Sequence, residues 1–272
     1  MMENKIYEKL LNLLKKNALH SSILIHGPQG IGKSHIVQEI TKRILKIHQL
    51  ISPDLRMILS ENISIDNIRQ VISFSTSTPV NQYKVIILDK IDNMSMNAMN
   101  AMLKLIEEPQ LNTYIFLVAN NLHNIPMTVR SRCLKIPMIK PTLNEFNTIV
   151  SSKVSSEKAP DWYLNYLYRV FEGNMNAVIE MISTCDDKLL HKLKNFDIAE
   201  MMIELENNPS NKFIIKIILF ELANKIKSST TPLLLISEFE RINKEYSKIS
   251  SYNLSETNAV FSILNSSELV NS

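Results

Sequence analysis

Glycine and cysteine are scarce in this sequence, and long apolar runs are missing. Only four glycines and two cysteines occur among 272 residues, which excludes glycine-rich fibres, a disulfide framework and a four-thiolate zinc site. No stretch approaches the roughly 18 uninterrupted apolar residues of a membrane-spanning helix, and the N-terminus is charged where a signal peptide would be apolar. The formal charge of +3 neither requires nor excludes a nucleic-acid groove. We expect a cytoplasmic protein without a membrane anchor.

The residues that are present describe a globular chain with a buried core, since 45% are apolar and 21% charged. As far as Pro137, apolar runs of strand length alternate with amphipathic helical patterns, one of which is predicted over Ser95 to Glu107 with Ser95 as its N-cap. This alternation predicts a three-layer α/β domain built on a parallel sheet. Beyond Pro141 only helical patterns continue, three short ones over 142–190 and several longer ones over 193–272. We therefore predict an α/β domain over 1–140, a small helical domain over 141–192 and a helical C-terminal domain over 193–272.

Three of the four glycines fall in one segment, GPQGIGKS, which matches the pattern G-x-x-x-x-G-K-[ST] between a predicted strand and a predicted helix. Glycines let successive backbone N–H groups turn toward one centre, and the helix N-terminus adds positive potential, so the segment suits a phosphate group. Lys33 would reach the β- and γ-phosphates of ATP, and Ser34 would bind Mg²⁺. The predicted nucleotide-binding residues are Gly27, Pro28, Gln29, Gly30, Ile31, Gly32, Lys33 and Ser34.

A second part of such a site follows the apolar run KVIILD. Asp89 at its end is placed to help hold Mg²⁺ together with Ser34. Hydrolysing relatives of this design commonly carry a glutamate next, whereas this chain has Lys90, which cannot accept a proton from water while it is protonated. Asp92 is expected to face elsewhere. The site is therefore predicted to hydrolyse ATP poorly or not at all.

The phosphate-loop segment is followed by SPDLRMI, by NAMLKLIEEP with an apolar strand after it, and by the Ser131-Arg132-Cys133 triplet. This combination carries a resemblance to bacterial DNA polymerase III clamp-loader subunits, a branch of the AAA+ ATPases. The resemblance is strong over residues 18–137 and weak in the C-terminal part. The Pro-Asp-Leu segment at Pro53, the short chain and the missing catalytic carboxylate are more similar to the delta-prime subunit than to the gamma/tau motor.

The resemblance implies an AAA+ module, made of the α/β domain and a helical lid, followed by an all-α collar. The collar would join a five-membered ring with the gamma/tau motor and delta subunits, and the ring would load a sliding clamp on primed DNA as part of a DNA polymerase holoenzyme. Arg132 would be an arginine finger, inserted in trans into the ATP site of the adjacent motor subunit. The chain itself would have little or no ATPase activity, and any ATP and Mg²⁺ would be bound weakly or vestigially.

Three positions bear on that assignment. Residues 48–60 contain no cysteine, so the zinc module common in the family is not expected. Asn176 stands where motor subunits tend to have an arginine that senses the γ-phosphate, which argues against hydrolysis. Asn120, after its strand, fits the position of the family's first sensor, although an ordinary polar strand end explains it nearly as well.

Three other interpretations stay open on the sequence alone. In the first, the chain would be a hydrolysing motor or another AAA+ ATPase. In the second, it would be a small-molecule kinase built on the same loop, and in the third, a structural protein with a vestigial loop. Lys90 and Asn176 count against the first, and the Ser-Arg-Cys triplet with the helical C-terminus is unexplained by the second. ATP binding in the millimolar range would separate our interpretation from the third.

Overall fold

The computed structural model describes residues 2–60, 62–154 and 160–184, together with 213, 216, 217, 220 and 221. The chain divides into two compact units. The first comprises Met1–Phe146 and Gly173–Asn176, and the second comprises Asn147–Glu172 and Ala177–Ser272. Apart from five positions, the predicted C-terminal domain over 193–272 lies outside the described residues. Within the described ranges, no helix combines the length and the apolar character needed to cross a bilayer.

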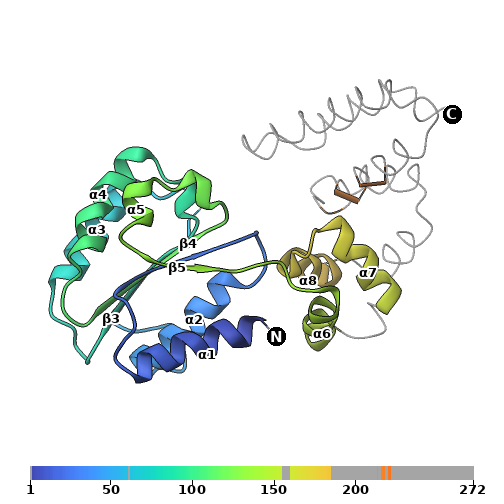
Figure 1. Ribbon diagram of the computed structural model, residues 1–272, viewed down its shortest axis with the longest axis horizontal. Helices are drawn as coiled ribbons and strands as arrows, with labels where there is room; N and C mark the ends of the chain where they lie inside the picture. Colours follow the sequence, from blue (N-terminus) through green and yellow to red (C-terminus); the bar gives the residue numbers. More distant parts are fainter. Residues whose placement is uncertain are drawn as a thin grey trace. The chain divides into compact units, whose positions relative to one another are not determined.

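A five-stranded parallel sheet forms the middle of the first unit (Figure 1). Its strand order is β2-β3-β4-β1-β5, so the strand that precedes the phosphate loop lies between β4 and β5. The edge strand β2 had no strand pattern in the sequence, because only Ile58 at its end is buried. The strands are β1 (Ser22–His26), β2 (Leu55–Ile58), β3 (Lys84–Leu88), β4 (Thr113–Ala119) and β5 (Leu134–Pro137).

Helices cover both faces of this sheet, as the alternating pattern predicted (Figure 1). Helices α1 (Met2–Lys15) and α2 (Lys33–Leu45) pack on one face, against side chains that include Val85 and Ile87 of β3. Helices α3 (Ile65–Thr76), α4 (Met96–Glu107) and α5 (Met127–Arg130) lie on the other face, against side chains that include Ile86 and Leu88. Both faces of β3 are buried, which explains its continuous apolar sequence. The three-layer α/β fold is confirmed.

The beginning of α4 confirms a local prediction. The Ser95 hydroxyl accepts a hydrogen bond from the backbone N–H of Ala98 at 3.3 Å, which is the expected N-cap. At the other end of the helix, the buried Ser22 hydroxyl donates to the carbonyl of Ile106 at 3.0 Å. The last turn of α4 is therefore tied to strand β1.

The second unit is helical in its described part. Three helices occur where the sequence predicted three, α6 (Leu143–Lys153), α7 (Asp161–Val170) and α8 (Met175–Thr184), and the first residues of α6 and α8 belong to the first unit. The amide of Asn147 donates to Asn165 at 3.0 Å, and the Tyr166 hydroxyl donates to the Glu221 carboxylate at 2.9 Å. The unit thus has its own polar links between segments far apart in the chain.

Candidate phosphate-binding site

Three predicted site residues meet at the carboxyl edge of the sheet. Gly27 follows β1, Asp89 follows β3 and Asn120 follows β4. Strand β4 pairs with both β1 and β3, and it does so in register, with His26 beside Ala119 and Leu88 beside Leu117. The parallel pairing therefore brings the phosphate loop, Asp89 and Asn120 to one place.

The loop itself depends on two glycines that leave room for other groups. A Cβ atom on Gly27 would lie 2.0 Å from the Met138 carbonyl oxygen, and one on Gly30 would lie 1.6 Å from the Asn174 side-chain oxygen. Gly30 also has a φ of +73°, which residues with side chains rarely adopt. A side chain at position 27 would therefore displace backbone, and one at position 30 would strain the loop and displace the Asn174 side chain.

The Lys33 ammonium group is held by the loop and by Asn120. Its Nζ atom donates to the carbonyls of Gly27 at 2.8 Å and Pro28 at 2.6 Å, and to Oδ1 of Asn120 at 2.9 Å. Burial lowers the pKa of Lys33 to about 8, against the opposing effects of Asp89 and Asp92. All three ammonium donors are thereby used, so a phosphate bound here would have to replace some of these partners.

The two predicted magnesium-binding side chains touch each other. The Ser34 hydroxyl donates to Oδ2 of Asp89 at 2.6 Å, so the hydroxyl and the carboxylate lie together at the start of α2. Such an oxygen pair beside a phosphate cradle fits Mg²⁺ chemistry. The other carboxylate oxygen, Oδ1, accepts from the backbone N–H of Lys90 at 2.8 Å. These residues suit a nucleotide with its metal ion, but Lys90 provides no general base.

The remaining predicted loop residues have structural surroundings that differ from one another. Gln29 is exposed, whereas Ile31 is 2% exposed and packs in the core that α1 and α2 share. Gly32 is the residue before α2 and has a φ of +94°. The buried Ile31 side chain thus fixes the loop to the core. The nucleotide-binding role of each loop residue stays a prediction.

Asp92 has a part in this site that the sequence reasoning missed. Its two carboxylate oxygens accept from the backbone N–H groups of Asn120 at 3.1 Å and Asn121 at 3.2 Å. Asp92 therefore fixes the segment whose Asn120 side chain binds Lys33. No local pattern could reveal this contact, because Asp92 and Asn120 are 28 residues apart.

The segment Gly173–Asn176 also reaches the phosphate loop within the first unit. The backbone N–H of Asn176 donates to the Gly30 carbonyl at 3.4 Å, and the Asn174 side chain fills the space above Gly30. The Asn176 side chain is exposed. The resemblance had placed the family's γ-phosphate sensor position at Asn176. The backbone contact brings Asn176 next to the loop, where its side chain is an amide and not the guanidinium of an arginine.

Arg132 lies outside the phosphate loop, between α5 and β5. Val129 and Cys133, which flank it, are 1% and 8% exposed and belong to the core under α3 and α4. The Arg132 side chain itself is 33% exposed and forms an ion pair with Glu107. That contact raises the pKa of Arg132 above its usual value. The segment is thus anchored by its neighbours, while the Arg132 side chain stays partly exposed.

Cys133 should be chemically inert in the folded protein. Burial raises its pKa to about 11, and the thiolate is the reactive form. In a Cys185→Ser variant, we expect iodoacetamide at pH 8.5 to alkylate Cys133 about 100-fold more slowly than in the urea-unfolded chain, as measured by mass spectrometry. Equal rates in the two states would show that Cys133 does not anchor this segment.

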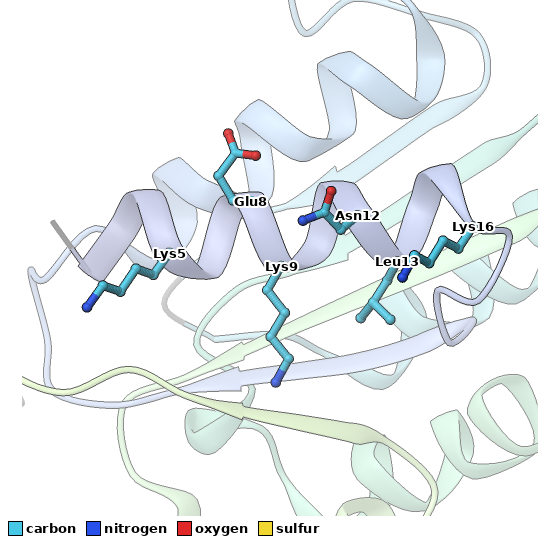
Figure 2. A pocket seen from close by; sticks show the side chains of 6 residues that line it. All are labelled: Lys5, Glu8, Lys9, Asn12, Leu13 and Lys16. Atoms are coloured by element: carbon cyan, nitrogen blue, oxygen red, sulfur yellow. The ribbon is translucent and has the colours of Figure 1, made fainter.

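A surface hollow on α1 is separate from these residues (Figure 2). Figure 2 shows the Lys9 side chain on the opposite side of the helix from Glu8. The lining comes from α1 and from Lys16 just after it, and includes no residue of the phosphate loop. The lining residues are Lys5, Glu8, Lys9, Asn12, Leu13 and Lys16.

Comparisons with known proteins find similarity to subunits of DNA polymerase III and of replication factor C. Residues 41–142 match the family model described as DNA polymerase III, delta subunit. The chain is 29% identical over 166 residues to the DNA polymerase III subunit delta' of Buchnera aphidicola, covering 52% of this chain and 50% of that one. It is 24% identical over 229 residues to the tau/gamma subunit of Haemophilus influenzae, covering 76% and 33%. It is 29% identical over 143 residues to replication factor C subunit 5 of Mus musculus, covering 47% and 42%.

A solved structure shares the fold. The crystal structure of a DNA polymerase III gamma subunit-related protein from Thermotoga maritima superposes with a TM-score of 0.55 at 19% identity, over 95% of this chain and 97% of that one. The chain spans between a third and a half of the length of the three curated relatives above.

Proposed function

We propose that this chain, which belongs to the clamp-loader family of AAA+ proteins, is a delta-prime-type subunit that supplies Arg132 to a neighbouring subunit's ATP site. The neighbour would be a gamma/tau-type motor, and a delta subunit would complete a five-membered ring in the cytoplasm. The ring would open a sliding clamp and place it on primed DNA. The observation that carries this proposal is the setting of Arg132, whose partly exposed side chain stands on a segment anchored by buried Val129 and Cys133.

The chemistry of arginine suits this role. A guanidinium is permanently charged and planar, and two of its N–H groups can follow the charge that develops on a transferred phosphoryl group. The residue after Asp89 supports the proposal that the chain does not hydrolyse ATP itself, since Lys90 stands where a hydrolytic glutamate would be needed. The chain would therefore complete another subunit's site while performing no hydrolysis itself.

Nucleotide binding by the chain itself is proposed to be weak or vestigial. Gly27–Ser34 would hold the phosphates, and Ser34 with Asp89 would hold Mg²⁺. Against tight binding, Lys33 already has three oxygen partners and Ser34 is bonded to Asp89. Some of these contacts must be exchanged when ATP and Mg²⁺ bind, which lowers the net affinity.

A hydrolysing motor is the second candidate function. The complete phosphate loop and the Ser34–Asp89 pair favour it, as does the match with tau/gamma relatives. Lys90 and Asn176 disfavour it. The two functions differ in what the isolated chain does to ATP.

The proposal predicts that the isolated chain does not turn over ATP. In a single-turnover assay with excess chain and radiolabelled ATP–Mg²⁺, we expect no phosphate release above the uncatalysed rate, because Lys90 stands where a hydrolytic glutamate would act as the general base. Added to motor and delta subunits with clamp and primed DNA, the chain should stimulate ATP turnover. A Lys33→Ala variant should stimulate nearly as well as the wild type. Brisk hydrolysis by the chain alone would instead establish the motor function.

A further inference from the structure

The Arg132 guanidinium is held by two neighbouring elements. Its Nη2 atom donates to Oε1 of Glu107 at 3.1 Å, and Nη1 donates to the Thr128 carbonyl at 2.9 Å. Nε lies 3.1 Å from the second Glu107 oxygen, which is an ion-pair distance, although its N–H makes no hydrogen bond. Glu107 thus contacts the side of the guanidinium with both carboxylate oxygens.

This arrangement leaves donors for another ligand. An arginine has five N–H donors, and each terminal nitrogen has two. One on Nη1 and one on Nη2 are used by Thr128 and Glu107, so each terminal nitrogen retains one N–H with no acceptor among the described residues. Arginine binds a phosphate group by donating two such N–H groups to two of its oxygens.

Glu107 stands on a fixed support. It is the last residue of α4, and the preceding Ile106 is 2% exposed and accepts the hydrogen bond from buried Ser22. A carboxylate at a helix C-terminus is electrostatically unfavourable, because that end of the helix carries a partial negative charge. Glu107 therefore does not stabilise α4 electrostatically. The side-chain contact that the structure shows for Glu107 is the one with Arg132.

We propose that Glu107 is a positioning residue for Arg132, which orders the guanidinium before it meets the neighbouring subunit's γ-phosphate. This inference rests on the proposed function of Arg132. A long arginine side chain loses rotamer freedom when it binds, and a guanidinium that is already ordered loses less. The pair is half exposed, so it is weak enough to readjust when a phosphate arrives.

The test uses Glu107→Gln, which removes the charge but keeps the shape, in the full chain assembled with motor, delta, clamp and primed DNA. Other motor sites are inactivated so that only the site facing Arg132 reports. We expect kcat for ATP to fall about twofold to fivefold, the range for an exposed ion pair, with KM changed less than twofold. Glu108→Gln is the matched control and should change neither value, because it alters the same charge one residue away.

A double-mutant cycle separates positioning from a general structural effect. In an Arg132→Ala background, Glu107→Gln should have no further effect on kcat. A Glu107→Gln effect that persists in that background, a rise in kcat, or an effect equal to that of Glu108→Gln would overturn the positioning role. If Arg132→Ala alone leaves kcat unchanged, the proposed function fails instead, so the two failures are distinguishable.

Discussion

Replacing Arg132 with alanine is expected to slow ATP hydrolysis at the neighbouring site by about 10³-fold or more, the range in which arginine fingers act. The charge that develops on the γ-phosphoryl group would then lack its guanidinium partner. The measurement is ATP turnover by the reconstituted ring with only that site active, together with clamp loading on primed DNA. Assembly should be intact in size-exclusion chromatography, because the Arg132 side chain is partly exposed and is not part of the core.

Two further variants sharpen this prediction. Arg132→Lys keeps the charge but loses the planar pair of donors, so it should restore little activity. Arg69→Ala is the matched control, because Arg69 also forms an exposed ion pair, with Asp66 at 3.0 Å, and lies on α3. Turnover that is unchanged in Arg132→Ala, or equally reduced in Arg69→Ala, would contradict the assignment of the finger.

Replacing Asp54 with alanine should destabilise the first unit by about 3 kcal/mol, because charge-assisted hydrogen bonds are lost from a buried group. Asp54 is 1% exposed and accepts from the backbone N–H groups of Val80 at 2.7 Å and Asn81 at 2.8 Å, and from the Asn81 side-chain amide at 3.0 Å. It joins the segment before β2 to the loop before β3. The Asp of the Pro-Asp-Leu segment, a family marker in the sequence, thus has a structural role.

The measurement for Asp54→Ala is urea unfolding followed by circular dichroism. Fluorescence would not serve, since the only tryptophan, Trp162, lies in the second unit. Asp66→Ala is the control, because Asp66 is 73% exposed and should contribute less than about 1 kcal/mol. Equal losses for the two variants would show that the Asp54 hydrogen bonds do not hold this part of the fold together.

Periodicity and local motifs account for what could be predicted of the fold. The continuous apolar run at β3, the Ser95 cap of α4 and the glycine spacing of the phosphate loop each describe a local arrangement, and the structure has all three. Strand β2 escaped detection because an edge strand with one buried residue lacks a clear pattern. The segment 193–272 was predicted helical from its patterns alone, and that stays a prediction.

By itself, the sequence predicted the α/β class and the phosphate loop, with Asp89 and Asn120 after later strands, because these depend on residue type and spacing. Arg132 as the candidate finger was implied by the resemblance to clamp-loader subunits. Only the tertiary structure decided which side chains support them. Asp92 reaches Asn120 across 28 residues, Asp54 reaches Val80 across 26, and Glu107 reaches Arg132 across 25. Such contacts arise when packed helices and paired strands bring distant segments together, and no local pattern records them.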